Sequence, residues 1–132
     1  PPPAGLAVAD LRSPADGGAV TVGPDDTLLT AYNRMRQADV SQLPVLDGGR
    51  LIGLIDESDL LEAVEDSKPD KRFAQSVAAA MTAKLDTLQA GDPLDALLPV
   101  FEKDQVAIVL DGREFVGLIT RLDLINYLRR AA

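Results

Sequence analysis

The sequence contains an internal repeat, and this feature limits most strongly how the chain can fold. The segment Gly53–Leu60, with the sequence GLIDESDL, returns 64 positions later as Gly117–Leu124, with the sequence GLITRLDL. The turn Asp47-Gly48 recurs at the same spacing as Asp111-Gly112. A repeat of this length indicates one supersecondary unit that is present twice. We therefore expect two similar halves.

Upstream of these segments the spacing between the copies changes. Residues 25–28 (DDTL) correspond to residues 91–94 (GDPL) at a spacing of 66 positions. The two copies therefore differ in length by two residues somewhere between this turn and the hairpin that follows.

The sequence of each copy predicts the same two elements at its start, a strand and a helix. A short strand (19–22; 85–88) runs into an amphipathic helix (26–37; 92–103). The apolar face of that helix recurs at a three-to-four spacing and is formed by Leu28, Tyr32 and Met35 in the first copy and by Leu94, Leu97, Leu98 and Phe101 in the second. Asp92 followed by Pro93 predicts a helix start, because aspartate caps free amides and proline suits the first turn.

A hairpin and a closing helix complete each copy. Two apolar runs, 42–46 with 51–55 and 106–110 with 114–119, are joined through Asp-Gly, which is a hairpin signal. The closing helices are expected at about 57–65 and 121–130. The unit is therefore β-α-β-β-α, twice. A half unit of about 55 residues leaves one apolar face exposed, so we expect the two copies to pack as a single cooperative domain.

The segments between and before the copies carry weaker signals. Residues 65–72 are charged and contain Pro69, which predicts an exposed linker. The alanine-rich run 73–81 is predicted to be helical and is similar to residues 6–11 ahead of the first copy. We expect residues 1–5 to be a disordered linker.

Composition excludes several classes of function. The chain has no cysteine and no histidine, so thiolate chemistry and the commonest general base and transition-metal ligand are absent. A formal charge of −8 disfavours nucleic acid and anionic membranes as partners. No membrane span or signal peptide is evident, so the expected location is the cytoplasm. We interpret the acidic residues as a solubilising surface and predict no metal site, since their spacing does not form a calcium loop.

The two copies resemble the tandem CBS domain pair, also called a Bateman module. The resemblance rests on Val40–Asp47 with Gly53–Asp59, and on Gln105–Asp111 with Gly117–Asp123. It implies an α+β (α/β) fold in which two CBS repeats pack as one pseudo-twofold module. The expected organisation is CBS domain 1 at 6–66, a linker at 67–72 and CBS domain 2 at 73–132. The family also implies an adenosine-type ligand, which is AMP, ATP or S-adenosylmethionine.

The last segment resembles the C-terminal regulatory region of bacterial cystathionine β-synthase. This similarity rests on residues 115–128, FVGLITRLDLINYL. It implies a pyridoxal-phosphate (PLP) catalytic domain in the same polypeptide, upstream of Pro1. No cofactor is expected in the present chain, which contains no nucleophile paired with a base and no Gly-rich phosphate loop. We therefore expect a regulatory chain with no catalytic residues of its own.

The resemblance places the stronger ligand site in the second copy. The helix dipole at Thr120 would attract a phosphate, Asp123 would accept hydrogen bonds from the ribose, and Arg121 would add a cation. The adenine would lie against Val106, Ile108, Thr87 and Leu88. Two simpler interpretations stay open: Thr120 and Asp123 form a capping box, and the apolar residues belong to the core.

The first copy departs from the family pattern at its equivalent site. Asp56 occupies the threonine position and Glu57 follows it, so two carboxylates would repel a phosphate. An uncharged adenosine or the sulfonium cation of S-adenosylmethionine would suit this site better. Its residues would be Asp59 on the ribose, Asp56 beside it, and Leu43, Pro44, Thr21 and Val22 along the base. An empty, purely structural site is the alternative.

Two functions are consistent with these observations. The first is a sensor whose ligand changes how a catalytic domain is held or how subunits associate. The second is a ligand-free structural dimerisation module, with the helices from Asp26 and Asp92 or the terminal row of Leu122, Ile125 and Leu128 as the contact. A homodimer is expected in either case.

Overall fold

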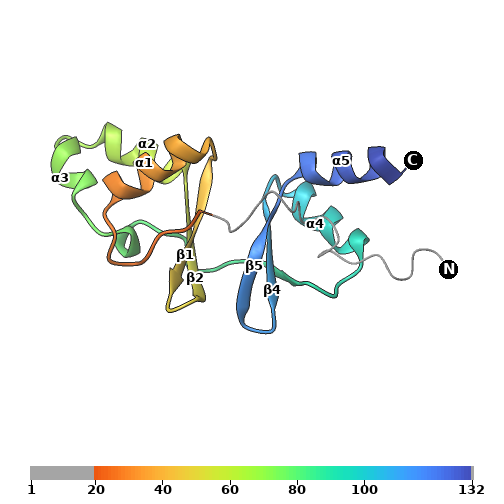
Figure 1. Ribbon diagram of the computed structural model, residues 1–132. Coiled ribbons are helices and arrows are strands. Elements are labelled where there is room, and N and C mark those ends of the chain that lie inside the picture. The colour runs from red at the N-terminus through yellow and green to blue at the C-terminus, as the bar shows by residue number, and fades with distance from the viewer. Residues whose placement is uncertain (1–19, 132) are drawn as a thin grey trace. The chain divides into compact units, whose positions relative to one another are not determined.

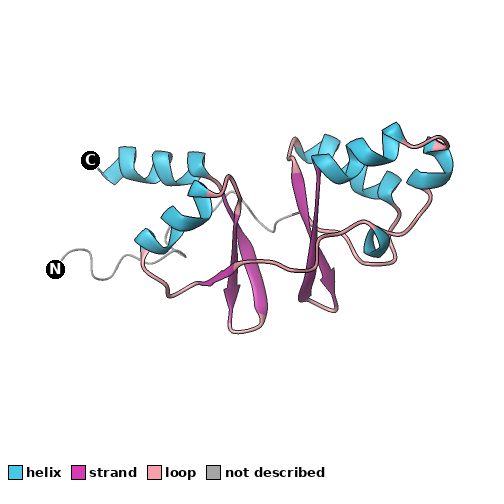
Figure 2. Ribbon diagram, turned by 180° about the vertical axis from the view of Figure 1, so that it is seen from behind, coloured by secondary structure: helices cyan, strands magenta, loops and turns pink. Residues whose placement is uncertain are grey.

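The computed structural model describes residues 20–131 of the chain (Figure 1). These residues divide into two compact units, the first comprising Val20–Leu85 and the second comprising residues 86–131. Each unit contains one copy of the repeat and combines helices with strands (Figure 2), which confirms the α+β fold class. Position 19 and the predicted segments at 1–5 and 6–11 lie outside the described residues.

The first unit is built on one antiparallel hairpin. Its elements are α1 (Leu28–Ala38), β1 (Gln42–Asp47), β2 (Arg50–Asp56), α2 (Glu57–Glu65) and α3 (Pro69–Phe73). Leu43 pairs with Ile55 across the hairpin. Of the predicted first strand, the described part contributes an isolated parallel bridge from Val22 to Val45. On the other side, Leu54 and Thr82 exchange two backbone hydrogen bonds of 2.9 Å each.

The second unit repeats this plan with small shifts. Its elements are β3 (Thr87–Gln89), a 3₁₀ turn (Leu94–Ala96), α4 (Leu97–Glu102), β4 (Ala107–Asp111), β5 (Glu114–Ile119) and α5 (Arg121–Ala131). β3 runs parallel to β4, and β4 runs antiparallel to β5 with Ala107 opposite Ile119. The predicted strand at 85–88 therefore begins two residues later than expected, whereas the hairpin and the closing helix lie where the repeat predicted them.

Glycine is needed at the tips of the two hairpins. Gly48 and Gly49 have φ values of 60° and 85°, and Gly112 has a φ of 63°. Side chains with a Cβ atom rarely adopt this left-handed region, whereas glycine does so without steric cost. The Asp-Gly signal thus marked both turns correctly.

The first helix of each unit is flanked by aspartates with the same roles. Asp26 accepts a hydrogen bond from the amide of Gly23 (2.7 Å), and Asp92 accepts one from the amide of Gln89 (2.8 Å). At the other end, Asp39 (φ 56°) and Asp104 (φ 58°) both adopt the left-handed conformation that commonly closes a helix.

The predicted cap at Asp92 is wrong. Its carboxylate turns back to Gln89, and no described side chain caps the 3₁₀ turn that follows. In the first unit the cap is Thr27, whose hydroxyl accepts from the amide of Thr30 (3.1 Å). The helix predicted over 92–103 is accordingly a 3₁₀ turn followed by a short α4. Pro99 contributes to this break, because it has no N–H to donate to the preceding turn.

Residues 65–81 also differ from the prediction. The expected linker contains α3, and the expected helix over 73–81 contains one 3₁₀ turn, Val77–Ala79. Tertiary bonds override the alanine propensity, since Leu28 donates its N–H to the Gln75 carbonyl (3.0 Å) and Val77 donates to the Asp26 carbonyl (2.7 Å). Residues 73–85, which were predicted to belong to the second CBS domain, therefore pack within the first compact unit.

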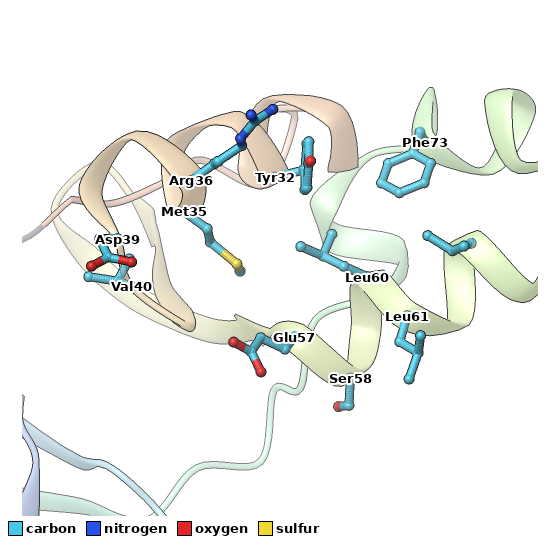
Figure 3. Close-up of a pocket in the computed structure, with 11 residues that line it drawn as sticks. Tyr32, Met35, Arg36, Asp39, Val40, Glu57, Ser58, Leu60, Leu61 and Phe73 are labelled. Atoms are coloured by element: carbon cyan, nitrogen blue, oxygen red, sulfur yellow. The ribbon is translucent and has the colours of Figure 1, made fainter.

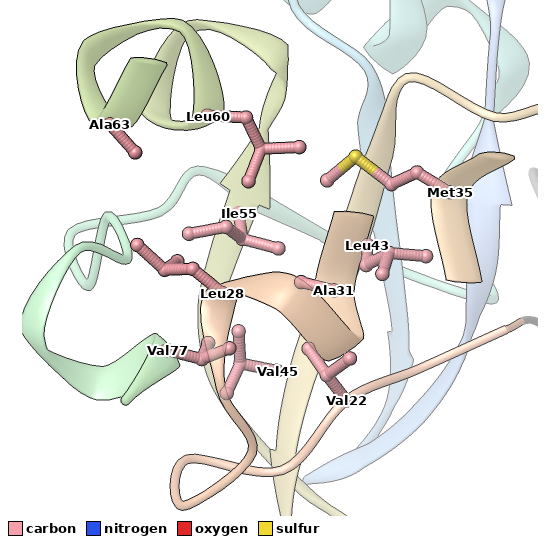
Figure 4. Packing of buried hydrophobic residues seen from close by; sticks show 10 residues of the cluster. All are labelled: Val22, Leu28, Ala31, Met35, Leu43, Val45, Ile55, Leu60, Ala63 and Val77. Carbon is pink, nitrogen blue, oxygen red and sulfur yellow. The ribbon is translucent and has the colours of Figure 1, made fainter. Parts of the chain in front are cut away.

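Each unit has its own hydrophobic core. The first core lies between the hairpin and the helices (Figure 4) and is formed by Val22, Leu28, Ala31, Met35, Leu43, Val45, Ile55, Leu60, Ala63 and Val77. The second is formed by Leu97, Val100, Phe101, Ala107, Val109 and Ile119. Two residues of the predicted helix faces are instead largely exposed, namely Tyr32 (39%) and Leu98 (51%). Within residues 20–131 no helix has the length and apolar character to cross a membrane.

Candidate functional site

The closing helix of the first unit begins with a complete capping box. The Asp56 carboxylate accepts from the amides of Ser58 (3.0 Å) and Asp59 (3.2 Å), and the Asp59 carboxylate accepts from the amide of Asp56 (2.9 Å). The hydroxyl of Ser58 also donates to Asp56 (2.6 Å). These bonds satisfy amides that the helix itself leaves unpaired. The structure thus brings Asp56 and Asp59 together, as the repeat predicted.

The two carboxylates of this box have pKa values that move in opposite directions. Partial burial raises the pKa of Asp59 to about 6, and repulsion from the carboxylates of Asp56 and Glu62 adds to the rise. Partial burial also acts to raise the pKa of Asp56, but the hydrogen bonds from Ser58 and Asp59 outweigh it and lower that pKa below its usual value. Asp59 is therefore the member of the pair that takes up a proton near pH 6.

The closing helix of the second unit also begins with a capping box, which is formed by a threonine and an aspartate in place of two aspartates. Oδ2 of Asp123 accepts from the Thr120 amide (2.8 Å) and from the Thr120 hydroxyl (3.0 Å). The hydroxyl oxygen of Thr120 in turn accepts from the Asp123 amide (3.2 Å). Oδ1 of Asp123 has no hydrogen-bond partner within residues 20–131. The capping interpretation of Thr120 and Asp123 therefore describes their contacts, and one carboxylate oxygen stays available for a ligand.

Arg121 is engaged within its own unit. Its guanidinium donates to the Phe101 carbonyl and to the Asp104 carboxylate, with which it forms an ion pair. This bridge ties the start of α5 to the end of α4. The cation expected beside a phosphate is thus shared with Asp104, although its side chain is still 57% exposed.

The other predicted residues of the second copy lie at the same end of their strands. Thr87 pairs with Ile108 across β3 and β4, and Val106 immediately precedes β4, next to the end of β5 from which Thr120 follows. Thr87 is exposed, Leu88 and Val106 are half-buried, and Ile108 is 3% exposed. Leu88 packs against the core of the second unit. The register therefore gathers Thr87, Ile108, Val106 and Thr120 at one edge.

The corresponding residues of the first copy are more deeply buried. Leu43 and Val22 belong to the core, with exposed fractions of 0% and 2%, and Pro44 is also fully buried. Thr21 is half-buried, and its carbonyl accepts from the Arg34 guanidinium (2.8 Å). At Val22 and Leu43 a ligand would meet backbone groups, because the side chains are already packed.

A groove that the sequence did not predict lies between α1, α2 and α3 of the first unit (Figure 3). Its volume is about 790 Å³, and its lining is mainly apolar with charged residues at one end: Tyr32, Met35, Arg36, Asp39, Val40, Glu57, Ser58, Leu60, Leu61, Val64 and Phe73. Phe73 from α3 contacts Tyr32 from α1 edge to face, with ring centroids 6.3 Å apart. Two apolar residues of α2 that line it, Leu61 (57%) and Val64 (56%), are more than half exposed.

The described part of the chain contains no group of three or more acidic side chains that could hold a metal ion.

Comparison with known proteins identifies the repeat. A family model described as CBS domain matches residues 8–66 and 76–130. The chain is 29% identical over 108 residues to inosine-5'-monophosphate dehydrogenase of Methanocaldococcus jannaschii, which covers 81% of this chain and 21% of that protein. It is 25% identical over 131 residues to cystathionine beta-synthase of Dictyostelium discoideum, covering 96% and 26%. The chain spans between 21% and 35% of the length of the first three curated relatives.

Solved structures show the same fold. A CBS domain-containing protein of unknown function from Bacillus anthracis superimposes with a TM-score of 0.83 at 21% identity, covering 96% of this chain and 95% of that one. CBSX2, whose structure was determined in complex with AMP, superimposes with a TM-score of 0.81 at 22% identity, covering 96% and 98%.

Proposed function

The chain belongs to the CBS domain family, and from that premise we propose that it is a non-catalytic regulatory module that binds an adenosine-type ligand. The observation that carries the proposal is the start of α5. There the amides of the first helical turn, Thr120 and the open Oδ1 of Asp123 lie beside the strand edge formed by Thr87, Ile108 and Val106. The AMP complex of CBSX2, a protein of the same fold, supports an adenosine nucleotide as the ligand class.

In the second unit the proposed ligand is phosphorylated. Helix amides and the positive end of the helix dipole attract a phosphate at Thr120, and the guanidinium of Arg121, which pairs with Asp104 but is 57% exposed, follows it in the chain. Oδ1 of Asp123 accepts from a ribose hydroxyl without giving up the bonds that Oδ2 makes to Thr120. AMP and ATP fit these requirements best.

In the first unit the same position favours a ligand without a phosphate. Asp56 is ionised and Glu57 follows it, so the start of α2 carries negative charge where α5 offers a hydroxyl and an arginine. Uncharged adenosine or the cationic S-adenosylmethionine would be accepted, with Asp59 on the ribose. A structural site with no ligand is the alternative for this unit.

Isothermal titration of the chain with AMP, ATP and S-adenosylmethionine tests the proposal. We expect Asp123→Ala to weaken nucleotide binding by about tenfold or more, because a charge-assisted hydrogen bond is lost. Asp59→Ala removes the same capping contact from the first unit and is the matched control, so it should leave nucleotide binding unchanged. Equal weakening by both variants, or no heat with any of the three ligands, would remove the support for this function.

Asp56→Thr tests the assigned ligand charge. It gives α2 the threonine that α5 has, so the first unit should gain affinity for AMP and the stoichiometry should rise from one toward two. A stoichiometry of two in the unmodified chain would show that the carboxylate does not exclude phosphate.

A purely structural dimerisation module is the second candidate. The observation that favours it is the set of large apolar side chains left exposed on α2 and α5, including Leu61, Val64, Ile125 and Leu128 at 54–58%. Dissociation of a homodimer on dilution, with no response to any adenosine compound, would favour this candidate over the sensor.

We further propose that the module acts on a catalytic partner in the cytoplasm. A ligand shifts such a partner only through different affinities for two arrangements, typically by about 1 to 3 kcal/mol. The similarity to a cystathionine beta-synthase supports a PLP-dependent catalytic domain in the same polypeptide. The similarity to inosine-5'-monophosphate dehydrogenases supports a different catalytic partner equally well, so we assign no reaction to the partner.

A further inference from the structure

The guanidinium of Arg121 is held in place through a single one of its nitrogens. Nη2 donates to the Phe101 carbonyl and to Oδ1 of Asp104, which both lie at the end of α4. Nε and Nη1 make no hydrogen bond to any residue between 20 and 131. An arginine carries five N–H donors, so most of this group's capacity is open to a further acceptor. Arg121 immediately follows Thr120, where the helix amides form the proposed phosphate position.

The ion pair between Arg121 and Asp104 is exposed to solvent. The two side chains are 57% and 82% exposed. Water screens a pair of this kind, so it adds little to stability and is broken at low cost. A phosphate is a stronger partner for a guanidinium, because its oxygens accept two parallel bonds and its charge exceeds that of one carboxylate. A phosphate at the start of α5 would therefore compete with the Asp104 carboxylate for Arg121.

The first unit shows that the turn at Asp104 does not need this ion pair. Asp39 is its equivalent, with a φ of 56° against 58°, and each donates its amide to the carbonyl three residues earlier (3.4 and 3.0 Å). Glu57 stands where the second unit has Arg121. Asp39 shares the groove with Glu57 and Arg36 (Figure 3) but forms no ion pair with a described residue. The ion pair is thus particular to the unit to which we assign the phosphorylated ligand.

We propose that Asp104 is a specificity-determining residue of the nucleotide site, whose carboxylate holds Arg121 in the free protein and competes with the ligand phosphate for it. This inference rests on the nucleotide site proposed above and names a residue that acts on the ligand through Arg121. The bond to the Phe101 carbonyl keeps the guanidinium at the start of α5, while the bond to Asp104 is exchanged for one to the phosphate. Asp104 therefore sets how strongly the site prefers AMP over adenosine.

Isothermal titration of the full chain with AMP and with adenosine tests this role. Asp104→Asn removes the charge and keeps a side chain that tolerates the left-handed backbone. We expect it to tighten AMP binding by about threefold to fivefold, the effect of an exposed ion pair, and to leave adenosine binding unchanged. Asp104→Gly, which suits the same φ, should give the same result. Asp39→Asn removes the equivalent charge from the first unit and is the matched control, so AMP binding should not change.

A double-mutant cycle shows whether Asp104 acts through Arg121. Arg121→Gln should weaken AMP binding by about tenfold and leave adenosine binding unchanged, because a charge-assisted bond to the phosphate is lost. In the Arg121→Gln background, Asp104→Asn should have no further effect, since there is no guanidinium left to release. A carboxylate that acted on the phosphate only by long-range repulsion would instead tighten AMP binding equally in both backgrounds.

The outcomes distinguish this inference from the proposed function. Absence of heat with AMP from the unmodified chain overturns the assigned nucleotide and this inference together. AMP binding that Asp104→Asn leaves unchanged, or tightens in the Arg121→Gln background as well, overturns only the role of Asp104. Equal weakening of AMP and adenosine binding by Asp104→Asn also overturns that role, because it would show that the bridge only supports the fold.

Discussion

The two halves of the chain share their backbone devices but differ at the start of their closing helices. In the first unit α2 begins with Asp56 and Glu57, and in the second α5 begins with Thr120 and Arg121. Both starts form a capping box, in which the residue at the helix start and the aspartate three positions later each accept a hydrogen bond from the other's amide. The charge at the two helix starts differs. The comparison shows that two caps that stabilise the same helix start can carry different charges.

The helix that precedes each hairpin gives a second contrast. α1 runs for 11 residues from a threonine cap, whereas α4 has 6 residues and follows a 3₁₀ turn. Proline at position 99 accounts for part of this difference. The second unit therefore has a shorter first helix.

The largest expected effect tests whether the two cores are equivalent. Ile55 and Ile119 occupy the same repeat position and are buried to 0% and 2% exposure. Ile55→Ala and Ile119→Ala should each lower the free energy of unfolding by about 2 to 5 kcal/mol, because each leaves a cavity. Urea denaturation followed by circular dichroism measures this. Two separate transitions, each shifted by one variant alone, would contradict the single cooperative domain that the repeat predicts.

A smaller loss of stability is expected from substituting one of the two glycines that occupy the same position of the repeat, Gly53 and Gly117. A Cβ atom added at Gly53 would lie 2.5 Å from Sδ of Met81 and 3.1 Å from the carbonyl oxygen of Thr82. At Gly117 no heavy atom of the described residues, apart from the glycine and its two chain neighbours, lies within 4 Å of that position. Gly53→Ala should therefore cost about 1 to 3 kcal/mol in thermal unfolding, and Gly117→Ala, the matched control, should stay within about 0.5 kcal/mol. Equal losses would show that the close approach of residues 81 and 82 is not what requires glycine.

The smallest expected effect is a change in the free energy of unfolding with pH. The pKa of Asp59 rises from 3.8 to about 6 on folding, so the folded state binds more protons between about pH 4 and pH 6. Stability should therefore fall as pH rises through that window and stay level above it. Asp59→Asn should remove this fall, which we place at about 1 kcal/mol because solvent screens the half-exposed pair. Denaturation at pH 4, 5, 6 and 7 measures it.

Asp56→Thr sharpens the same measurement. It removes the neighbouring carboxylate but leaves the partial burial of Asp59, which is the larger cause of its raised pKa. The fall in stability between pH 4 and pH 6 should therefore shrink without vanishing. An unchanged pH profile in both variants would show that this pair does not set the pH dependence.

Local chemistry explains which elements were predictable from the sequence. The hairpins follow from Asp-Gly between apolar runs, and the closing helices follow from residues that cap them, such as Asp56 and Thr120. The fold class follows from the repeat of these elements. The helix expected over 73–81 failed because its backbone is bonded to distant residues, including Asp26 and Leu28, which no local pattern records.

The candidate site was predictable in part. The repeat located Thr120 and Asp123 and their counterparts Asp56 and Asp59, since these lie next to a strand end within a few residues of one another. The bridge from Arg121 to Asp104 was not foreseen, because it joins residues that only the fold brings together. The groove of the first unit was missed for the same reason, since it needs α3 to bring Phe73 against Tyr32.

The left-handed aspartates Asp39 and Asp104 carry a record of how the chain arose. A residue with a Cβ atom in this conformation carries a steric cost that glycine would avoid, yet both halves keep aspartate at the end of the same helix. Inheritance from a single half-length ancestor, by gene duplication and fusion, accounts for such a shared peculiarity. These aspartates are 65 positions apart and the hairpins 64, so one residue was gained or lost between helix and hairpin after the duplication. The different residues at the two closing-helix starts, Asp56 with Glu57 and Thr120 with Arg121, would then have arisen after that duplication.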